Sequence, residues 1–133
     1  MSSPTPSRDL SFERALYESV VARDPANVEA LMALGEAYTK DRDYVRGLEV
    51  DQRLARLRPA DPVVLYNLAC SHALLGGADL AFEVLGRAVD LGYADLAHLD
   101  GDPDLEGIRK DARFTEIRER LLRRSGVPKV SKT

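Results

Sequence analysis

The chain has 133 residues, of which 44% are hydrophobic and 31% are charged, and its formal net charge is −3. This composition is ordinary for a globular protein, and the length fits one domain. No apolar run approaches the roughly 18 residues of a membrane helix, and a single cysteine, Cys70, can form neither an internal disulfide nor a multi-cysteine zinc site. We therefore expect a protein without a membrane span, located in the cytoplasm.

The first residues predict a flexible lead followed by one helix. Residues 1–7 are rich in serine and proline and lack the apolar core of a signal peptide. Apolar residues then recur at helical spacing over residues 10–23, and Pro25 follows, 34 positions before Pro59. We expect residues 8–25 to form an N-terminal half-repeat, in which this helix takes the place of the second helix of a repeat and caps the front of an array.

The central part of the chain contains two copies of one pattern, 34 residues apart. The matched positions are Leu31 and Leu65, Leu34 and Leu68, Gly35 and Ala69, Tyr38 and His72, Gly47 and Ala81, and Leu54 and Ala88. The first four positions follow the spacing i, i+3, i+4, i+7 of one helical stripe, and the small residues allow two backbones to approach closely. We therefore expect two antiparallel helix pairs, residues 28–61 and 62–93, that bury their stripes by stacking.

The ends of these helices are marked by capping residues. Asn27 and Asp43 precede the two helices of the first pair, and Asp61 followed by Pro62 begins the second pair. Gly92 stands at the C-terminal position where a helix commonly ends.

These two copies resemble tetratricopeptide repeats. The first copy matches the pattern of the family at Leu31, Leu34, Gly35, Tyr38, Tyr44, Gly47, Leu54 and Pro59, and the second at Leu65, Leu68, Ala69, His72, Gly76, Ala81, Leu85 and Ala88. One position departs from the pattern, because Asp51 stands where the second copy has Leu85, and we expect Val50 and Leu48 to carry that packing instead. The resemblance implies an all-α, right-handed α-solenoid of antiparallel helix pairs, with about seven or eight helices.

Residues 94–125 no longer follow the repeat and predict C-terminal capping helices. Asp102 and Pro103 begin a short helix, and a longer one covers roughly residues 112–124, with Phe114, Ile117 and Leu121 on one face. This stretch resembles the terminating segment that follows tetratricopeptide arrays in many bacterial proteins. The resemblance implies a lid over the final repeat, with Phe114 as its plug, and a bacterial source.

The resemblance also implies that the first helix of each pair lines an inner groove that binds peptides or partner helices. In this sequence the groove positions would be Glu29, Met32, Glu36, Thr39, Lys40, Val63, Tyr66, Asn67, Cys70, Ala73 and Leu74. The second half of this set is mostly apolar, so its helix should be covered on both sides. The face with Tyr66, Cys70 and Leu74 is therefore either the binding surface or lies beneath the terminal segment. Asn67 matches one position of a carboxylate-binding clamp, but Met32 and Glu36 occupy the upstream positions, so we do not expect that clamp.

Charge is divided unevenly along the chain. Residues 1–104 hold ten basic and eighteen acidic side chains, whereas residues 105–133 hold nine basic and four acidic ones. The arginines of the C-terminal part could contact phosphates, but pairs such as Glu116–Arg120 need no ligand, so nucleic acid is not the expected partner. Residues 126–133 predict a flexible basic tail.

For each candidate catalytic or metal site, a structural role explains the residues better than a chemical function does. Cys70, Ser71 and His72 are consecutive on a helix and point to different faces, so they cannot form a nucleophile and base pair. Acidic residues from Asp100 to Asp111 have the spacing of a calcium loop, but Leu105 stands where that loop needs glycine. We therefore predict no enzyme activity, no cofactor and no metal. The expected function is an adaptor that binds another protein, and the alternative is a scaffold that forms a homodimer through the apolar inner stripe.

Overall fold

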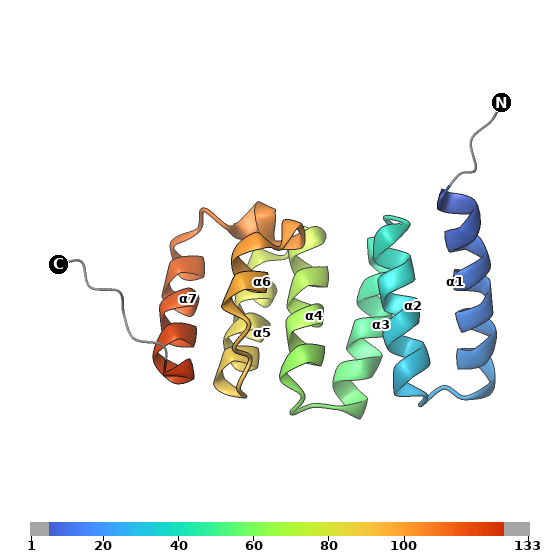
Figure 1. Cartoon of the computed structure of the whole chain (residues 1–133), viewed down its shortest axis with the longest axis horizontal. Helices are drawn as coiled ribbons and strands as arrows, with labels where there is room; N and C mark the ends of the chain where they lie inside the picture. Colours follow the sequence, from blue (N-terminus) through green and yellow to red (C-terminus); the bar gives the residue numbers. More distant parts are fainter. Residues whose placement is uncertain (1–5, 127–133) are drawn as a thin grey trace. The chain divides into compact units, whose positions relative to one another are not determined.

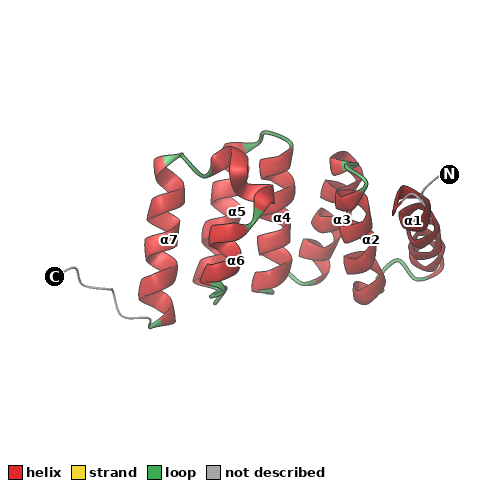
Figure 2. Cartoon of the chain, turned by 45° about the horizontal axis from the view of Figure 1, so that its top comes forward, coloured by secondary structure: helices red, strands yellow, loops and turns green. Residues whose placement is uncertain are grey.

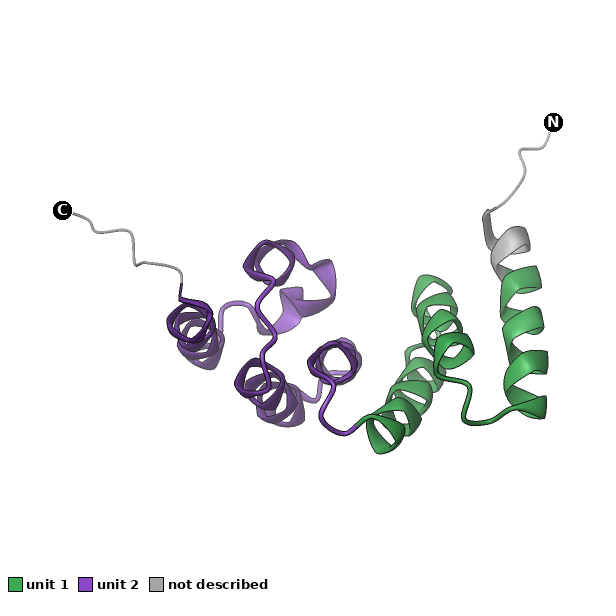
Figure 3. Ribbon diagram, turned by 60° about the horizontal axis from the view of Figure 1, so that its bottom comes forward, with its two compact units in different colours: residues 1–58 green, residues 59–133 purple. Residues whose placement is uncertain are grey.

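The computed structural model describes residues 6–126, with side chains from residue 11, as two compact units, residues 1–58 and 59–133 (Figure 3). Every regular element within the described residues is helical (Figure 2). In chain order (Figure 1) they are α1 (Pro6–Arg23), α2 (Val28–Lys40), α3 (Tyr44–Leu57), α4 (Pro62–Leu74), α5 (Ala78–Asp90), α6 (Leu96–Gly101), the 3-10 helix η1 (Pro103–Ile108) and α7 (Ala112–Ser125). The predicted all-α fold of helix pairs is confirmed.

The predicted helix caps are present. The side chain of Asn27 accepts a hydrogen bond from the Ala30 amide at 3.0 Å, and that of Asp61 accepts from the Val63 amide at 2.9 Å. Asp43 caps α3 in the same way. Each carboxylate or amide oxygen satisfies an amide that has no partner within the helix, which explains why the helices begin where the sequence predicted.

In the first unit, α2 packs between α1 and α3. Gly35 allows the close approach of α3, since a Cβ atom at this position would lie 3.3 Å from a carboxylate oxygen of Asp51. Asp51 is buried against this glycine and Val50 is buried beside it, while Leu48 is half-buried. Val50 therefore packs in the core beside Asp51, as the sequence predicted, whereas Leu48 does so only in part.

An ion pair and a hydrogen bond connect α1 with α2 and the residue that follows it. Arg14 forms an ion pair with Asp41, and the Tyr38 hydroxyl donates a hydrogen bond to Glu18 at 2.5 Å. Burial of the Tyr38 ring, together with this carboxylate, raises the pKa of Tyr38 to about 12. α1 begins at Pro6, within the stretch predicted as a lead, and the rest of that lead lies outside the described residues.

In the second unit, α5 packs against α4 on one side and α7 on another. The repeat positions Leu65, Ala69, Ala81, Leu85 and Ala88 are all buried. Phe114, Ile117 and Leu121 of α7 are buried as well, as their helical spacing predicted. Residues 127–133 of the predicted tail lie outside the described part of the chain.

α6 and η1 lie between α5 and α7 in the chain, and η1 packs on α4. Leu99 and Leu105 are completely buried, and Ile108 is nearly so. η1 begins at Asp102 and Pro103 as predicted, whereas α6 was not recognised in the sequence. None of the helices described here is both long and apolar enough to cross a bilayer.

Candidate functional site

The α2 part of the expected groove is accessible. Glu29, Met32, Glu36 and Lys40 are exposed, and Thr39 is half-buried. They lie on the face of α2 that the packed stripe leaves free, as helical spacing requires. In the first unit, the expected contact residues therefore form an open surface of mixed charge.

The α4 part of the expected groove is mostly covered. Tyr66, Cys70 and Ala73 have only 2%, 6% and 8% of their surface exposed. The opposite side of α4 packs on α5, and η1 also packs on α4. Both sides of this helix are therefore buried, which explains why both sides carry apolar residues. The sequence left open whether this face is the binding surface or lies beneath the terminal segment. In the structure, Tyr66 and Cys70 lie beneath the terminal segment.

Asp102 joins the covering segment to α4 through polar contacts. One oxygen of its carboxylate, Oδ2, accepts a hydrogen bond from the Tyr66 hydroxyl at 2.7 Å and from the Cys70 thiol at 3.6 Å. Nε2 of His98 lies 3.2 Å from the same oxygen. The other oxygen accepts from the Asp104 amide at 2.9 Å and caps η1. Asp102 therefore supplies an acceptor for two buried donors of α4 while it also begins the covering helix.

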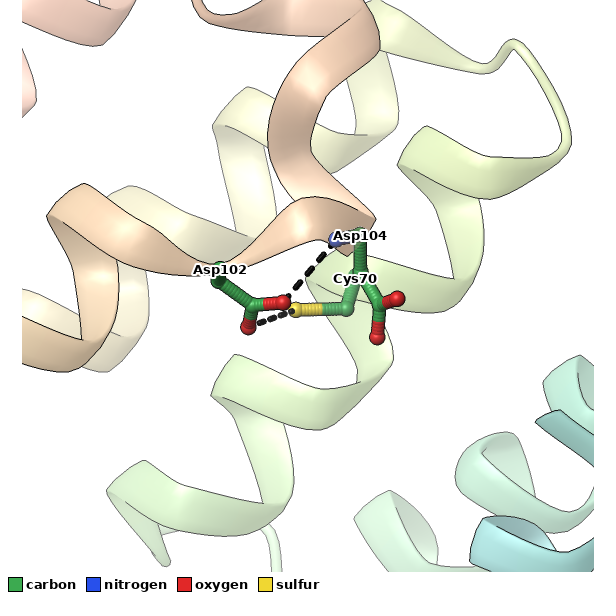
Figure 4. Close-up of side chains that lie close together, drawn as sticks. All are labelled: Cys70, Asp102 and Asp104. Atoms are coloured by element: carbon green, nitrogen blue, oxygen red, sulfur yellow. Dashed lines mark hydrogen bonds between the residues drawn. The ribbon is translucent and has the colours of Figure 1, made fainter. Parts of the chain in front are cut away.

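The same region brings together Cys70, Asp102 and Asp104, whose side chains could in principle ligate a metal ion (Figure 4). Their ligand atoms lie within 4.8 Å of one another. Burial raises the pKa of the Cys70 thiol and, together with Asp102, that of the Asp104 carboxyl, so both groups are held toward their protonated forms. A metal would need the deprotonated forms. The hydrogen bonds from Tyr66 and Cys70 to Asp102 explain the cluster without an ion.

The acidic residues that mimic a calcium loop have separate structural roles. Asp100 forms two hydrogen bonds with Arg118, and Asp111 caps α7 through the Arg113 amide. Asp102 caps η1, as described above. These roles account for three of the five acids, Asp100, Asp102 and Asp111, so the spacing alone does not indicate a calcium site.

A pocket of about 340 Å³ remains open beside the covered face of α4. It is lined by Val63, Asn67 and Tyr66 from α4, and by residues 92–95 and His98 from the segment that follows α5. Val63 is 48% exposed, whereas Tyr66 forms the floor, stacked on Tyr93 at a ring separation of 4.3 Å. Three predicted groove residues, Val63, Tyr66 and Asn67, therefore line the pocket, and Leu74 is half-buried further along α4. The contribution of residues 92–95 and His98 was not predicted, because Gly92 and Tyr93 are the last two residues of the second repeat and the others follow it.

Several arginines of the C-terminal part attach α7 to its neighbours. Arg113 bonds Asp79 at 2.8 Å and lies over the Phe82 ring of α5. Arg124 donates to the main-chain oxygens of Val89 and Asp90 at the end of the same helix. These contacts explain basic residues on α7 without a phosphate ligand.

Sequence comparison shows, independently of the structure, which known proteins this chain resembles. No family model matches the chain. The chain is similar to the peroxisomal targeting signal receptor of Komagataella phaffii, with 30% identity over 113 residues, which is 81% of this chain and 20% of that protein. It is also similar to a chloroplastic protein of Arabidopsis thaliana, with 30% identity over 62% of this chain and 26% of that protein. Cellulose synthase 2 operon protein C of Komagataeibacter xylinus shares 34% identity over 57% of this chain and 6% of its own length. The chain thus spans about a fifth of the length of the peroxisomal receptors that it matches.

Proposed function

We propose that this chain is a non-catalytic module of the tetratricopeptide repeat type that binds a peptide or a helix of another protein. The paired helices with the 34-residue pattern support this assignment, and so does the similarity, over 81% of the chain, to proteins named as receptors for a targeting signal. The observation that carries the proposal is the open pocket beside α4, where exposed Val63 lies next to buried aromatic rings. An apolar pocket with a few polar groups at its edge is typical of a site that anchors a side chain.

The binding residues are those that remain accessible. In the second unit they are Val63 and Asn67, together with His98, whereas Tyr66 lines the pocket but is only 2% exposed, and Cys70 is buried and does not line it. In the first unit, the exposed face of α2 supplies Glu29, Met32, Glu36 and Lys40. Because a groove of this size has few anchors, we expect modest affinity.

The single cysteine supports the proposal that the module is non-catalytic. The single thiol, Cys70, is buried, and burial raises its pKa, which is the opposite of what a catalytic thiolate needs. We propose residues 8–125 as the folded module, the cytoplasm as its location and a bacterium as its source.

Self-association through the inner stripe is the alternative. It has less support than peptide binding, because Tyr66, Cys70 and Ala73 are covered and the stripe therefore offers little accessible apolar surface. A homodimer that dissociates when Val63 is replaced by Glu would favour this alternative.

Peptide selection on the intact chain tests the proposal. The immobilised protein is used to enrich peptides from a random display library, and enriched sequences are titrated by fluorescence anisotropy. Val63→Glu and Asn67→Ala should each raise the Kd at least about tenfold. Leu80→Glu is the matched control, because Leu80 is 50% exposed at the start of α5 and does not line the pocket. Failure to enrich any peptide, or equal Kd values for Val63→Glu and the control, would reject the groove.

A further inference from the structure

The pocket beside α4 has a carboxylate in its wall and no basic side chain to balance it. Asp95 lines the pocket and is exposed, and the lining contains neither lysine nor arginine. One oxygen of Asp95 accepts a hydrogen bond from the His98 amide at 3.0 Å and caps α6. Among the residues that the structure describes, no basic side chain forms an ion pair with this carboxylate. Asp95 can therefore still accept hydrogen bonds from a cation in the pocket.

Other acidic residues of the second unit are paired with arginines of α7. Such ion pairs are made by Asp79, Asp90 and Asp100. Residues 59–104, which include the whole lining of the pocket, contain eight acidic residues and a single basic one, Arg87. Arg87 does not line the pocket. The pocket therefore lies in an acidic stretch, and the arginines that offset this charge elsewhere are bound to other carboxylates.

The rest of the pocket places apolar surface next to this charge. Val63 is 48% exposed, and Pro62 adjoins it at the start of α4. The stacked rings of Tyr66 and Tyr93 also line the pocket. Lysine and arginine are the side chains that combine a long apolar stem with a cationic head, and a cation is attracted to the face of a tyrosine ring. The lining thus matches both parts of a basic side chain.

We propose that this pocket anchors a lysine or arginine side chain of the partner peptide, with its stem against Val63 and Pro62 and its charged head at Asp95. The inference rests on the proposed function, because it specifies which residue the peptide places in the same pocket. Asn67 lines the pocket as well, and its side-chain oxygen can accept a further hydrogen bond from the head. Complementary charge would also select against other peptides.

An acidic side chain or a terminal carboxylate suits the pocket poorly. It would lie beside Asp95 with no lysine or arginine in the lining to neutralise it. Nε2 of His98 lies 3.2 Å from Oδ2 of Asp102, so a positive charge on the imidazole would already be balanced. Arg109 donates to the main-chain oxygens of Leu99 and Asp102 and is absent from the lining. An apolar side chain would fit the wall but would displace water from the Asp95 carboxylate without replacing its hydrogen bonds.

The peptide selection described above distinguishes these occupants. Peptides enriched on the immobilised full chain should share a lysine or an arginine at one position. The most enriched peptide is then titrated by fluorescence anisotropy beside a neutral counterpart, in which citrulline replaces that arginine or norleucine replaces that lysine. The basic peptide should bind about fivefold more tightly than the neutral one at about 50 mM NaCl, and the difference should shrink at about 500 mM.

Asp95→Asn tests the charge on the protein side, because an asparagine oxygen can still cap α6. The variant should raise the Kd of the basic peptide about fivefold and leave the Kd of the neutral peptide unchanged. Asp43→Asn is the matched control, since it makes the same change at the cap of α3 and lies outside the pocket lining. It should alter neither Kd. Val63→Glu should weaken both peptides, because both stems lose their apolar contact.

The outcomes separate this inference from the proposed function. Enriched peptides whose shared residue is acidic or apolar would overturn the basic anchor and leave peptide binding in place. An equal effect of Asp95→Asn on the two peptides would also overturn it, because the change would then act through α6 and not through charge. Failure to enrich any peptide would reject the proposed function, and the basic anchor with it.

Discussion

Replacing Tyr66 with Phe removes one oxygen atom from a buried position and leaves the rest of the ring in place. The Tyr66 hydroxyl donates to Asp102 at 2.7 Å, and the side chain is 2% exposed. The ring is stacked on Tyr93 with an angle of 5° between the planes, and phenylalanine can keep that contact. The substitution therefore isolates the hydrogen bond that links α4 to the covering segment.

A hydrogen bond to a charged group contributes roughly 1.5–3 kcal/mol. We expect the lower half of this range for Tyr66→Phe, because Asp102 keeps its contacts with Cys70, His98 and the Asp104 amide. Asp102→Ala should cost more, about 3 kcal/mol or above, because two buried donors lose their acceptor and η1 loses its cap. The double variant should show a coupling energy of at least about 1 kcal/mol between the two sites.

Urea denaturation followed by circular dichroism gives the free energies of unfolding for the double-mutant cycle. Hydrogen exchange resolved by peptide should report faster exchange in residues 96–108 for both single variants, because α6 and η1 lose an anchor. Tyr17→Phe on α1 is the control and should leave exchange in 96–108 unchanged. A coupling energy below about 0.3 kcal/mol, with unchanged exchange in this segment, would refute the role of Asp102 as the link.

Three further substitutions test the packing and charge of the two units. Phe114→Ala should destabilise the second unit by about 3–5 kcal/mol in urea unfolding, because the side chain is 5% exposed and its removal leaves a cavity. Gly35→Ala should fail to gain the roughly 1 kcal/mol that alanine has over glycine inside a helix, so its thermal midpoint should not exceed that of the wild type, since the added methyl group would lie 3.3 Å from a carboxylate oxygen of Asp51. The hydrogen bonds from Arg118 lower the pKa of Asp100 below its ordinary value of 3.8, so this pair stabilises the fold above that pH and the stabilisation is lost as the pH falls through the lowered pKa. In acid titrations, Asp100→Asn should therefore lose less stability than the wild type as the pH falls below about 4.

Each of these substitutions has an outcome that would contradict its reasoning. Gly101→Ala is the control for Gly35→Ala, because a Cβ atom at Gly101 meets nothing within 4 Å, and equal melting of the two variants would remove the close-approach argument. A loss below about 1 kcal/mol for Phe114→Ala would mean that α7 is not part of the core. Parallel acid curves for Asp100→Asn and the wild type would show that the Arg118 pair is too exposed to contribute.

The sequence was informative wherever a signal is local. Asn27 and Asp61 cap helices through hydrogen bonds to amides two or three residues away, so their effect is visible in a short stretch of sequence. The stripe in α2 and its copy in α4 have a helical period that packing then uses. α6 was missed because it has six residues, too few for a periodic pattern, and its buried anchor is the single residue Leu99.

The helical spacing of the apolar residues could not predict which residues of the candidate site are accessible, and Tyr66 shows why. A helix that is apolar on both sides must be covered on both sides, but the pattern is the same whether its own chain or a partner supplies the cover. A tyrosine hydroxyl and a thiol facing the same side add a second requirement, since buried donors need an acceptor. That acceptor is Asp102, 36 residues further along, which the sequence indicated only as a helix cap. One carboxylate that both caps η1 and accepts from α4 favours cover by the same chain, because a separate partner would have to bring its own acceptor to the buried tyrosine.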